Sequence, residues 1–292
     1  MPHPSRKHNI VCTEQLELRI LPTVKVNFNP KNGLLKITGD NDDNRVEVEG
    51  QGVEGTVEVF VDNESVGEFT NVVSIKANLK GGDDELDLAA FQIDGNVTVK
   101  LGDGADELDL DASARTVTEG LFIRGFLKAD LGNDVGDLAD FDDTVGIGGD
   151  ATITGVADVD FDGDGTFGTI VELNDDITFF SNLSINFSGL GDVNGDNFEL
   201  DFDNVNVAGT TTLDGSNKIE RFQFTNCNFD GDFNANMDDG NDVIDIDNGA
   251  VNENLFGSQA NFRGGDDNDT LLKGADNLFA QPELITGFET IV

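Results

Sequence analysis

The sequence predicts an all-β protein, a single-stranded parallel β-solenoid (a β-helix) that begins with an N-terminal β cap. Three observations predict it. An eleven-residue unit occurs twice, 22 residues apart, and Gly/Asp turns recur along most of the chain. The segments that flank those turns alternate between apolar and polar residues, which is the period of a β-strand. Recurrence at a fairly even spacing without helical periodicity is typical of stacked β repeats.

The duplicated unit runs over 78–88 and again over 100–110. Seven of its eleven positions are identical: a leucine, a glycine and the string Asp-Glu-Leu-Asp-Leu. The two leucines of that string point to one side of the strand and the aspartate between them to the other. One such unit cannot bury its leucines, whereas a stack of units can, so the pattern indicates a repeat protein.

The same pattern continues beyond the duplicated unit. An apolar residue precedes each Gly/Asp turn, at Leu79, Leu101, Leu131, Phe161, Phe187, Leu213, Met237 and Phe262. The spacing, roughly 20 to 30 residues, matches one repeat of a parallel β-solenoid. A two-sheet sandwich with short strands is the rival fold, but near-constant turn chemistry favours the solenoid.

The chain divides into three parts. Residues 1–22 form a lead-in that differs in composition from the rest, residues 23–78 an N-terminal β cap and first repeat, and residues 79–292 the solenoid repeats. The cap contains the hairpin signal Asp62-Asn63 between two β-like segments. A cap is needed because an uncovered terminal strand exposes unpaired backbone groups to other chains.

The net charge of the chain limits the kinds of molecule that it can bind. Seventeen basic against 58 acidic residues give a net charge of −41, and 41 of the acids are aspartate. Phosphate repulsion excludes nucleic acid as a partner, so calcium ions are the expected one. No run of 18 apolar residues is present, so no membrane span is expected. Cys12 and Cys227 are expected to be free thiols, because they form no disulfide framework.

Calcium is also the strongest candidate from the motifs. Gly102-Asp103-Gly104-Ala105-Asp106-Glu107-Leu108 reads Gly-x-Gly-x-Asp-x-Leu, and the strings at 239–244 and 264–271 are close to it. These strings resemble the nonapeptide of haemolysin-type (RTX) calcium-binding proteins, whose turn carbonyls and aspartate carboxylates bind Ca²⁺. The expected metal ligands are Asp83, Asp84, Asp103, Asp106, Asp239, Asp242, Asp266, Asp267 and Asp269. The chain departs from that family because its motif comes once per repeat and not twice.

A second acidic set follows from the strand alternation. Asp87, Asp109, Asp201 and Asp245 are expected on one outward face, where carboxylates of adjacent repeats lie about 5 Å apart. Each pair then costs about 0.8 kcal/mol in water unless a cation screens or coordinates it. Hard oxygen ligands suit Ca²⁺. Specific Ca²⁺ sites and a diffusely screened acidic face both remain open as interpretations.

Two stretches have the opening of an EF-hand or dockerin loop. The stretch 158–169 ends in Thr169, which makes no bidentate ligand, and in 192–203 Asn197 replaces the usual glycine. Without flanking helices both are interpreted as ordinary turns of the repeat.

Catalysis is not expected. The two histidines, His3 and His8, lie in the lead-in, so the repeats hold no His-based triad or zinc site. A polysaccharide-degrading parallel β-helix enzyme, a lyase or hydrolase, is the alternative. The body bases available to it, Arg115, Lys128 and Arg221, are interpreted as surface counter-charges. The chain has no Trp or Tyr, which also argues against a sugar-binding module.

The lead-in carries a second resemblance. Arg6, Lys7 and His8 precede the string Glu-Gln-Leu-Glu-Leu-Arg-Ile-Leu at 14–21. This string is similar to a segment near the N-terminus of exported planctomycete proteins, which implies export or surface attachment. A frayed amphipathic helix without a role is the competing interpretation. The sequence thus predicts a secreted or cell-surface, non-enzymatic, calcium-binding protein with a structural or adhesive role and cell-surface or matrix partners.

Overall fold

The computed structural model describes residues 24–115, 120–134, 136–157, 170–189, 197–217, 219–246, 253–274 and 276–292. The regular structure in these ranges consists of β-strands, so the predicted all-β class is confirmed. No helix in the described part is long or apolar enough to cross a lipid bilayer. The predicted lead-in, residues 1–22, lies outside the described residues.

The first of two large sheets contains one strand from each repeat. Its order is β1-β2-β6-β10-β13-β16-β18-β20-β23-β27-β31, and the short β7 pairs with β10. Its strands are β1 (Lys25–Asn29), β2 (Leu34–Thr38), β6 (Ser74–Asn78), β7 (Lys80–Gly81), β10 (Val97–Asp103), β13 (Leu127–Gly132), β16 (Ala151–Ala157), β18 (Leu183–Gly189), β20 (Thr211–Asp214), β23 (Phe233–Asn236), β27 (Ala260–Arg263) and β31 (Leu284–Thr286).

The second sheet takes the strands that follow each turn. They are β3 (Arg45–Gly50), β4 (Val57–Val61), β5 (Glu64–Phe69), β8 (Glu85–Ala89), β9 (Gln92–Ile93), β11 (Glu107–Asp111), β12 (Leu121–Ile123), β14 (Leu138–Asp142), β15 (Val145–Ile147), β17 (Ile170–Phe179), β19 (Asn197–Val207), β21 (Ile219–Thr225), β22 (Asn228–Phe229), β25 (Val243–Asp245), β26 (Leu255–Phe256), β29 (Thr270–Leu272), β30 (Leu278–Phe279) and β32 (Thr290–Ile291). A small sheet pairs β24 (Asp239–Gly240) with β28 (Asp266–Asp267).

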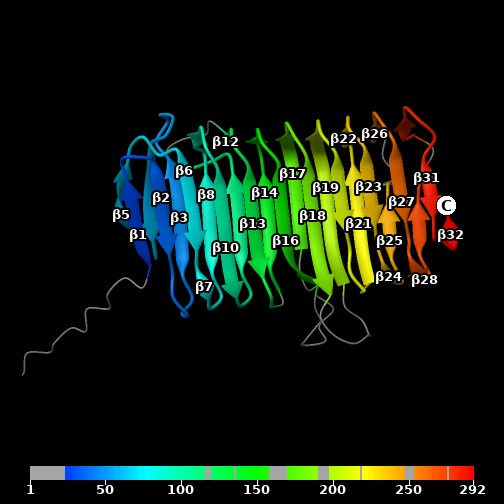
Figure 1. Ribbon diagram of the computed structural model, residues 1–292, viewed down its shortest axis with the longest axis horizontal. Coiled ribbons are helices and arrows are strands. Elements are labelled where there is room, and N and C mark those ends of the chain that lie inside the picture. Colours follow the sequence, from blue (N-terminus) through cyan, green and yellow to red (C-terminus); the bar gives the residue numbers. More distant parts are fainter. Residues whose placement is uncertain are drawn as a thin grey trace, which may run out of the picture.

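Beyond the N-terminal end, strands pair in parallel with the equivalent strands of the next repeat. In the first sheet Ile75 pairs with Val97, which pairs with Leu127. In the second sheet Leu86 pairs with Leu108, which pairs with Ala139. Figure 1 shows the outcome: the strands lie side by side along one long axis, from β1 at one end to β32 at the other. Equivalent residues of successive repeats therefore lie next to one another.

Antiparallel pairing among the described strands is confined to the N-terminal end. β1 pairs with β2, and β3, β4 and β5 form a meander whose last turn holds Asp62 and Asn63 at positive φ. Asn and Asp tolerate this backbone region better than other side chains with a Cβ, so the hairpin signal in the sequence has a direct cause. β2 and β3 also pair in parallel with β6 and β8, which joins this end to the stack.

The core is a column between the two sheets. Its N-terminal half consists mainly of Leu, Val and Ile, and its C-terminal half is rich in phenylalanine. Phe224, Phe229, Phe233 and Phe256 pack in edge-on and stacked pairs with centroids 4.6–5.8 Å apart. Aromatic rings in such arrangements gain attraction beyond the area that they bury. Cys227 is a buried free thiol beside these rings, and burial raises its pKa to about 12.

The register differs from the sequence prediction in three places. Gly155 is the residue that pairs with Phe187, whereas Phe161 lies outside the described residues. Leu213 pairs with Ile185 and not with the predicted Phe187. Phe262 pairs with Ala235 and not with the predicted Met237. A shift of two residues keeps a side chain on the same face of a strand, so the apolar pattern does not detect it.

The turns between the sheets stack so closely that some positions admit glycine alone. Gly102 has φ +134°, and a Cβ there would lie 1.8 Å from the carbonyl oxygen of Lys80. Gly132 stands one repeat further on, where a Cβ would lie 2.1 Å from the carbonyl oxygen of Gly102. The spacing of these glycines in the sequence thus follows from direct stacking of one turn on the next.

We expect Gly102→Ala to lower the free energy of unfolding by about 2–4 kcal/mol, because it combines backbone strain with a clash against a backbone oxygen. Gly67→Ala is the matched control: its φ is +152°, but a Cβ there meets nothing closer than 4.0 Å, so about 1 kcal/mol is expected. Urea denaturation of both variants measures the difference. Equal losses would show that the turns are not closely stacked.

Candidate functional site

The turns that join the first sheet to the second hold a file of buried acids. Five aspartates occupy the position directly before a second-sheet strand, and Glu220 occupies the equivalent position in β21. All six are at most 2% exposed. We call them the corner carboxylates: Asp84, Asp106, Asp137, Glu220, Asp242 and Asp269.

Backbone N–H groups of the preceding repeat hold the five corner aspartates in place, whereas Glu220 accepts from the N–H of Ser216 in its own turn. The N–H of Asp84 donates to Oδ1 of Asp106 at 2.8 Å, and the N–H of Asp106 donates to Oδ1 of Asp137 at 3.1 Å. The N–H of Asp242 donates to Oδ1 of Asp269 at 3.0 Å. One oxygen of each acceptor is therefore fixed. Along the axis the acids form two runs, Asp84–Asp106–Asp137 and Glu220–Asp242–Asp269, because Phe198 takes the equivalent position in β19.

An amide begins this file. Asn44 takes the corner position of the first repeat, and its N–H donates to Oδ1 of Asp84 at 2.8 Å. Its own Oδ1 accepts from the N–H of Asp40, and its Nδ2 donates to the carbonyl oxygen of Asp42 at 2.7 Å. A neutral side chain thus satisfies both of its polar ends within its own turn. The carboxylates that follow it do not achieve this.

The second carboxylate oxygen of the corner aspartates is the one that is left without a hydrogen bond. In the described part of the chain, Oδ2 of Asp84, Asp106, Asp137, Asp242 and Asp269 is buried and has no hydrogen-bond partner. For Asp269 this oxygen lies inside its own turn, since a Cβ at Gly264 would be 2.7 Å from it. A buried carboxylate oxygen without a partner is costly as an anion. A proton or a cation is needed there.

Burial shifts the acidity of these groups strongly. Desolvation raises the pKa of Asp84 to about 7, of Asp106 to about 6 and of Asp137 to about 8. The backbone N–H bonds oppose this shift, and the acid of the adjacent repeat adds to the rise for Asp84 and Asp137. The pKa values of Asp242 and Asp269 are raised by the same desolvation. At neutral pH the carboxyl groups of Asp84, Asp106 and Asp137 are therefore divided between protonated and charged forms.

A second file of acids lies on the outward face of the second sheet. Register pairing places Glu47, Asp87, Asp109, Asp140, Glu172 and Asp201 side by side, and we call this row the acidic ladder. Gln223 and then Asp245 continue the row. The expected common face of Asp87, Asp109, Asp201 and Asp245 is thus present.

The acidic ladder has aspartates with raised pKa values in its middle and arginines beside its two ends. Desolvation and then the charge of the next aspartate along the ladder raise the pKa of Asp87 and of Asp109 to about 7. Desolvation raises the pKa of Asp140 to about 6. At one end Arg115 contacts Glu47, and at the other Arg221 Nη2 lies 3.5 Å from Asp245 Oδ2. Both arginines therefore act as the counter-charges that the sequence indicated.

The nine predicted metal ligands fall into two groups. Asp84, Asp106, Asp242 and Asp269 are corner carboxylates, whereas Asp83, Asp103, Asp239, Asp266 and Asp267 are exposed on the outside of the turns. Within the described ranges, no three or more side chains of His, Cys, Asp or Glu form a group that holds a metal ion. Side-chain carboxylates alone therefore make no metal site in these ranges. The stretch 158–169 and residues 192–196 of the second EF-hand-like stretch lie outside the described residues.

Two corner carboxylates escaped the sequence reasoning. Asp137 lies one residue later in its turn than Asp106 does, because the step from Glu107 to Leu138 in the second sheet is one residue longer than the step from Val97 to Leu127 in the first. Glu220 was not predicted because it is a glutamate at a position where the other repeats have aspartate. Its Oε1 accepts from the N–H of Ser216 at 2.8 Å. An alignment of turns that allowed one insertion and either acid would have found both.

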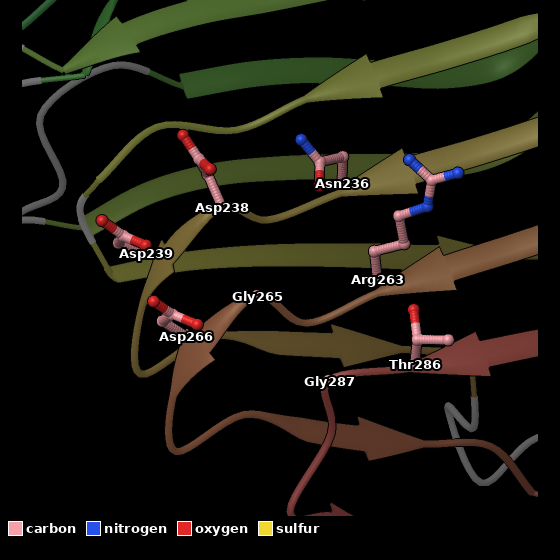
Figure 2. A pocket seen from close by; sticks show the side chains of 8 residues that line it. All are labelled: Asn236, Asp238, Asp239, Arg263, Gly265, Asp266, Thr286 and Gly287. Carbon is pink, nitrogen blue, oxygen red and sulfur yellow. The ribbon is translucent and has the colours of Figure 1, made fainter.

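A hollow of about 450 Å³ lies beside the C-terminal turns. Figure 2 shows three aspartates toward its turn end, with Asn236, Arg263 and Thr286 toward the strands. Two of the predicted ligands, Asp239 and Asp266, thus share a cavity wall with a guanidinium group. The hollow is lined by Asn236, Asp238, Asp239, Arg263, Gly265, Asp266, Thr286 and Gly287.

Comparison with models of known families, with curated proteins and with solved structures gives no match. The chemistry of this chain therefore has to be argued from its own residues.

We expect the metal-free protein to become more stable as the pH falls from 8 to 5. The raised pKa values mean that the folded state binds protons that the unfolded chain, with carboxyl pKa values near 4, releases. This stability is fully present below about pH 4 and is lost as the pH rises through the folded pKa values of about 6 to 8. Thermal melts followed by circular dichroism in chelator measure it.

These melts are best made at high ionic strength, which screens exposed charges more than buried ones. A melting temperature that stays flat or falls on acidification would contradict the protonation of buried carboxylates.

Proposed function

We propose that this chain is a non-enzymatic parallel β-solenoid, exported or displayed on a cell surface, whose stacked corners bind Ca²⁺ and are stiffened by it. The solenoid is supported by parallel pairing of equivalent strands in both sheets and by the close stacking of the glycine turns. Its role is structural or adhesive. This interpretation agrees with the resemblance of the turns to haemolysin-type calcium-binding repeats.

The observation that carries the proposal is the buried Oδ2 atom without a partner at Asp84, Asp106, Asp137, Asp242 and Asp269 in the described ranges. Ca²⁺ takes six to eight oxygen ligands and accepts carboxylates, backbone carbonyls and water together. A corner supplies one or two carboxylates, and the turn backbone supplies the carbonyl oxygens. This ligand set requires no group of three carboxylates.

Calcium would also relieve repulsion along the file. The corner carboxylates of adjacent repeats raise one another's pKa, as Asp106 does for Asp84 and for Asp137. A divalent cation between them replaces the proton and removes this cost. Because the carboxylates are aligned only in the folded stack, binding free energy adds to the stability of the fold.

We expect Ca²⁺ to raise the melting temperature in the millimolar range well above the value in Mg²⁺ at equal concentration and ionic strength, because Mg²⁺ gives up its water reluctantly. Melts with Ca²⁺, with Mg²⁺ and with chelator, all at pH 7.5, make the comparison. An equal response to both ions would show that the acids are only screened.

Asp106→Asn tests the corner itself. The amide keeps an oxygen for the N–H of Asp84 but removes the buried anion, so we expect a higher melting temperature in chelator and a smaller increase on addition of Ca²⁺. Asp62→Asn is the control, since Asp62 is exposed at positive φ in the N-terminal hairpin. If Ca²⁺ raises the melting temperature of both variants equally, Asp106 does not bind calcium.

One observation favours the alternative, a polysaccharide-degrading enzyme. Arg263 shares the hollow of Figure 2 with Asp238, Asp239 and Asp266, and a fixed cation beside carboxyl groups in a concave site is what acid–base cleavage of an acidic polysaccharide needs. Incubation with anionic and neutral polysaccharides tests it, with reducing ends and viscosity as readouts and Arg263→Ala as the control. We expect no cleavage by either protein.

A further inference from the structure

A second hollow of about 450 Å³ lies on the outward side of the second sheet, away from the corners. It is formed by the short strands β9, β12 and β15 and by the end of β17. Among its lining residues are Gln92, Phe122, Arg124, Gly146, Gly148 and Phe180. None of these belongs to the corner carboxylates or to the acidic ladder.

The hollow exists because one short strand, β15, has glycine at its outward position. Along this row Gln92 pairs with Phe122, Phe122 with Gly146, and Gly146 with Thr178. Val145 and Ile147 of β15 point into the core, so Gly146 takes its outward position. The result is a trench one strand wide, with walls about 10 Å apart because neighbouring strands lie about 4.8 Å apart.

Two phenyl rings border the floor of this trench. A Cβ at Gly146 would lie 2.5 Å from Cδ1 of Phe122 and 3.6 Å from Cε2 of Phe180. Phe122 is half-buried and lies over the glycine, whereas Phe180 is 60% exposed. In the described part of the chain, Phe180 is the most exposed phenylalanine. Exposed aromatic surface that lines a concave site indicates a ligand.

The rim of the trench carries hydrogen-bonding groups that hold one another in place. Arg124 donates through Nη1 to Oδ1 of Asp94 at 2.6 Å and also to Glu54. About half or more of each of these three side chains remains exposed. Gln92 adds an amide on the same side. Such polar groups around aromatic rings can bind a sugar ring, since its apolar face stacks on the aromatic rings and its hydroxyl groups hydrogen-bond the polar side chains.

The sequence argued against sugar binding because the chain has no Trp or Tyr, but the structure places two phenyl rings where they can take that role. We propose that this trench binds a neutral polysaccharide by stacking one of its pyranose rings on Phe122 and Phe180. The rim groups, Arg124, Asp94, Glu54 and Gln92, would hydrogen-bond the hydroxyls at the edge of the ring. The site is independent of the calcium proposal, because it shares no residue with the corners.

Charge and hydrogen bonding select this occupant over others. The net charge of −41 and the two carboxylates at the rim repel an anionic glycan or a second copy of this chain. An extended peptide cannot add as a strand, because the trench lies inside the sheet. The N–H of Gly148 donates to Ile123 O at 2.7 Å, and that of Phe180 to Ile147 O at 2.8 Å. The mode of peptide recognition that adds a strand to a sheet edge is therefore closed to this trench.

The next repeats extend the surface with polar groups. Thr178 pairs with Asn206, which pairs with Asn228, so a hydroxyl and two amides follow the aromatic floor along the axis. All three are half-buried. Oδ1 of Asn228 is buried, so the hydroxyl of Thr178 and the amide of Asn206 provide the hydrogen bonds for further units of a polymer that runs along the stack.

Affinity gel electrophoresis against neutral polysaccharides (hydroxyethylcellulose, laminarin, xylan, galactomannan) and the anionic alginate tests this inference. We expect at least one neutral polymer to retard the protein, alginate not to retard it, and Phe180→Ala to weaken binding about tenfold. Phe126→Ala is the matched control: Phe126 is 42% exposed but lies outside the trench, and its loss is expected to leave binding unchanged.

Light scattering of the wild type and of Phe180→Ala supplies the second measurement. Retardation by no neutral polymer, or equal effects of Phe180→Ala and Phe126→Ala, would overturn the inference. A dimer that Phe180→Ala dissociates would overturn it in favour of self-association. Asp106→Asn is expected to bind the polymer as the wild type does, so a failure of the calcium proposal leaves this one standing.

Discussion

In-register parallel pairing is the constraint on which the rest of this structure depends. Because strands bond to the equivalent strands of the next repeat, many similar side chains lie beside one another along the axis. Leucines stack on leucines in the core, and phenylalanines on phenylalanines further on. The same constraint lines up the aspartates, where stacking is unfavourable because adjacent carboxylates repel. The core and the acidic files are therefore two consequences of one pairing rule.

The chain relieves this repulsion in different ways at different places. At the ends of the acidic ladder, arginines contact the acids directly, as Arg115 does with Glu47. Between the ends the carboxyl groups of Asp87 and Asp109 have raised pKa values and hold protons more tightly. At the corners, backbone N–H groups bind one carboxylate oxygen and leave the other open. The corners are thus the places where a bound cation would add most to stability.

Glycine has opposite effects at two kinds of position. At the turns its absence of a side chain lets one repeat contact the next, as at Gly102 beneath Gly132. At β15 and directly after it the same absence makes room for the ring of Phe122 over Gly146 and leaves a trench on the outward face, which Gly146, Gly148 and Phe180 help to line. The first effect makes the stack continuous and the second interrupts its surface. A molecule built from near-identical repeats obtains a distinct site in this way, by omitting side chains from one of them.

The β class, the recurrence of Gly/Asp turns and the outward face shared by Asp87 and Asp109 could all be predicted from the amino-acid sequence. These features depend on local periodicity and on turn chemistry, which residues carry without their neighbours in space. The sequence did not determine the register of Leu213 and Phe262, since a two-residue shift leaves the apolar pattern unchanged. Only the tertiary structure decided that Asp84 and Asp106 are buried while Asp83 and Asp103 are exposed. The tertiary structure also places the rings of Phe122 and Phe180 beside the same glycine, Gly146. Burial and contact between repeats depend on which strands become neighbours, and that information is spread over residues far apart in the chain.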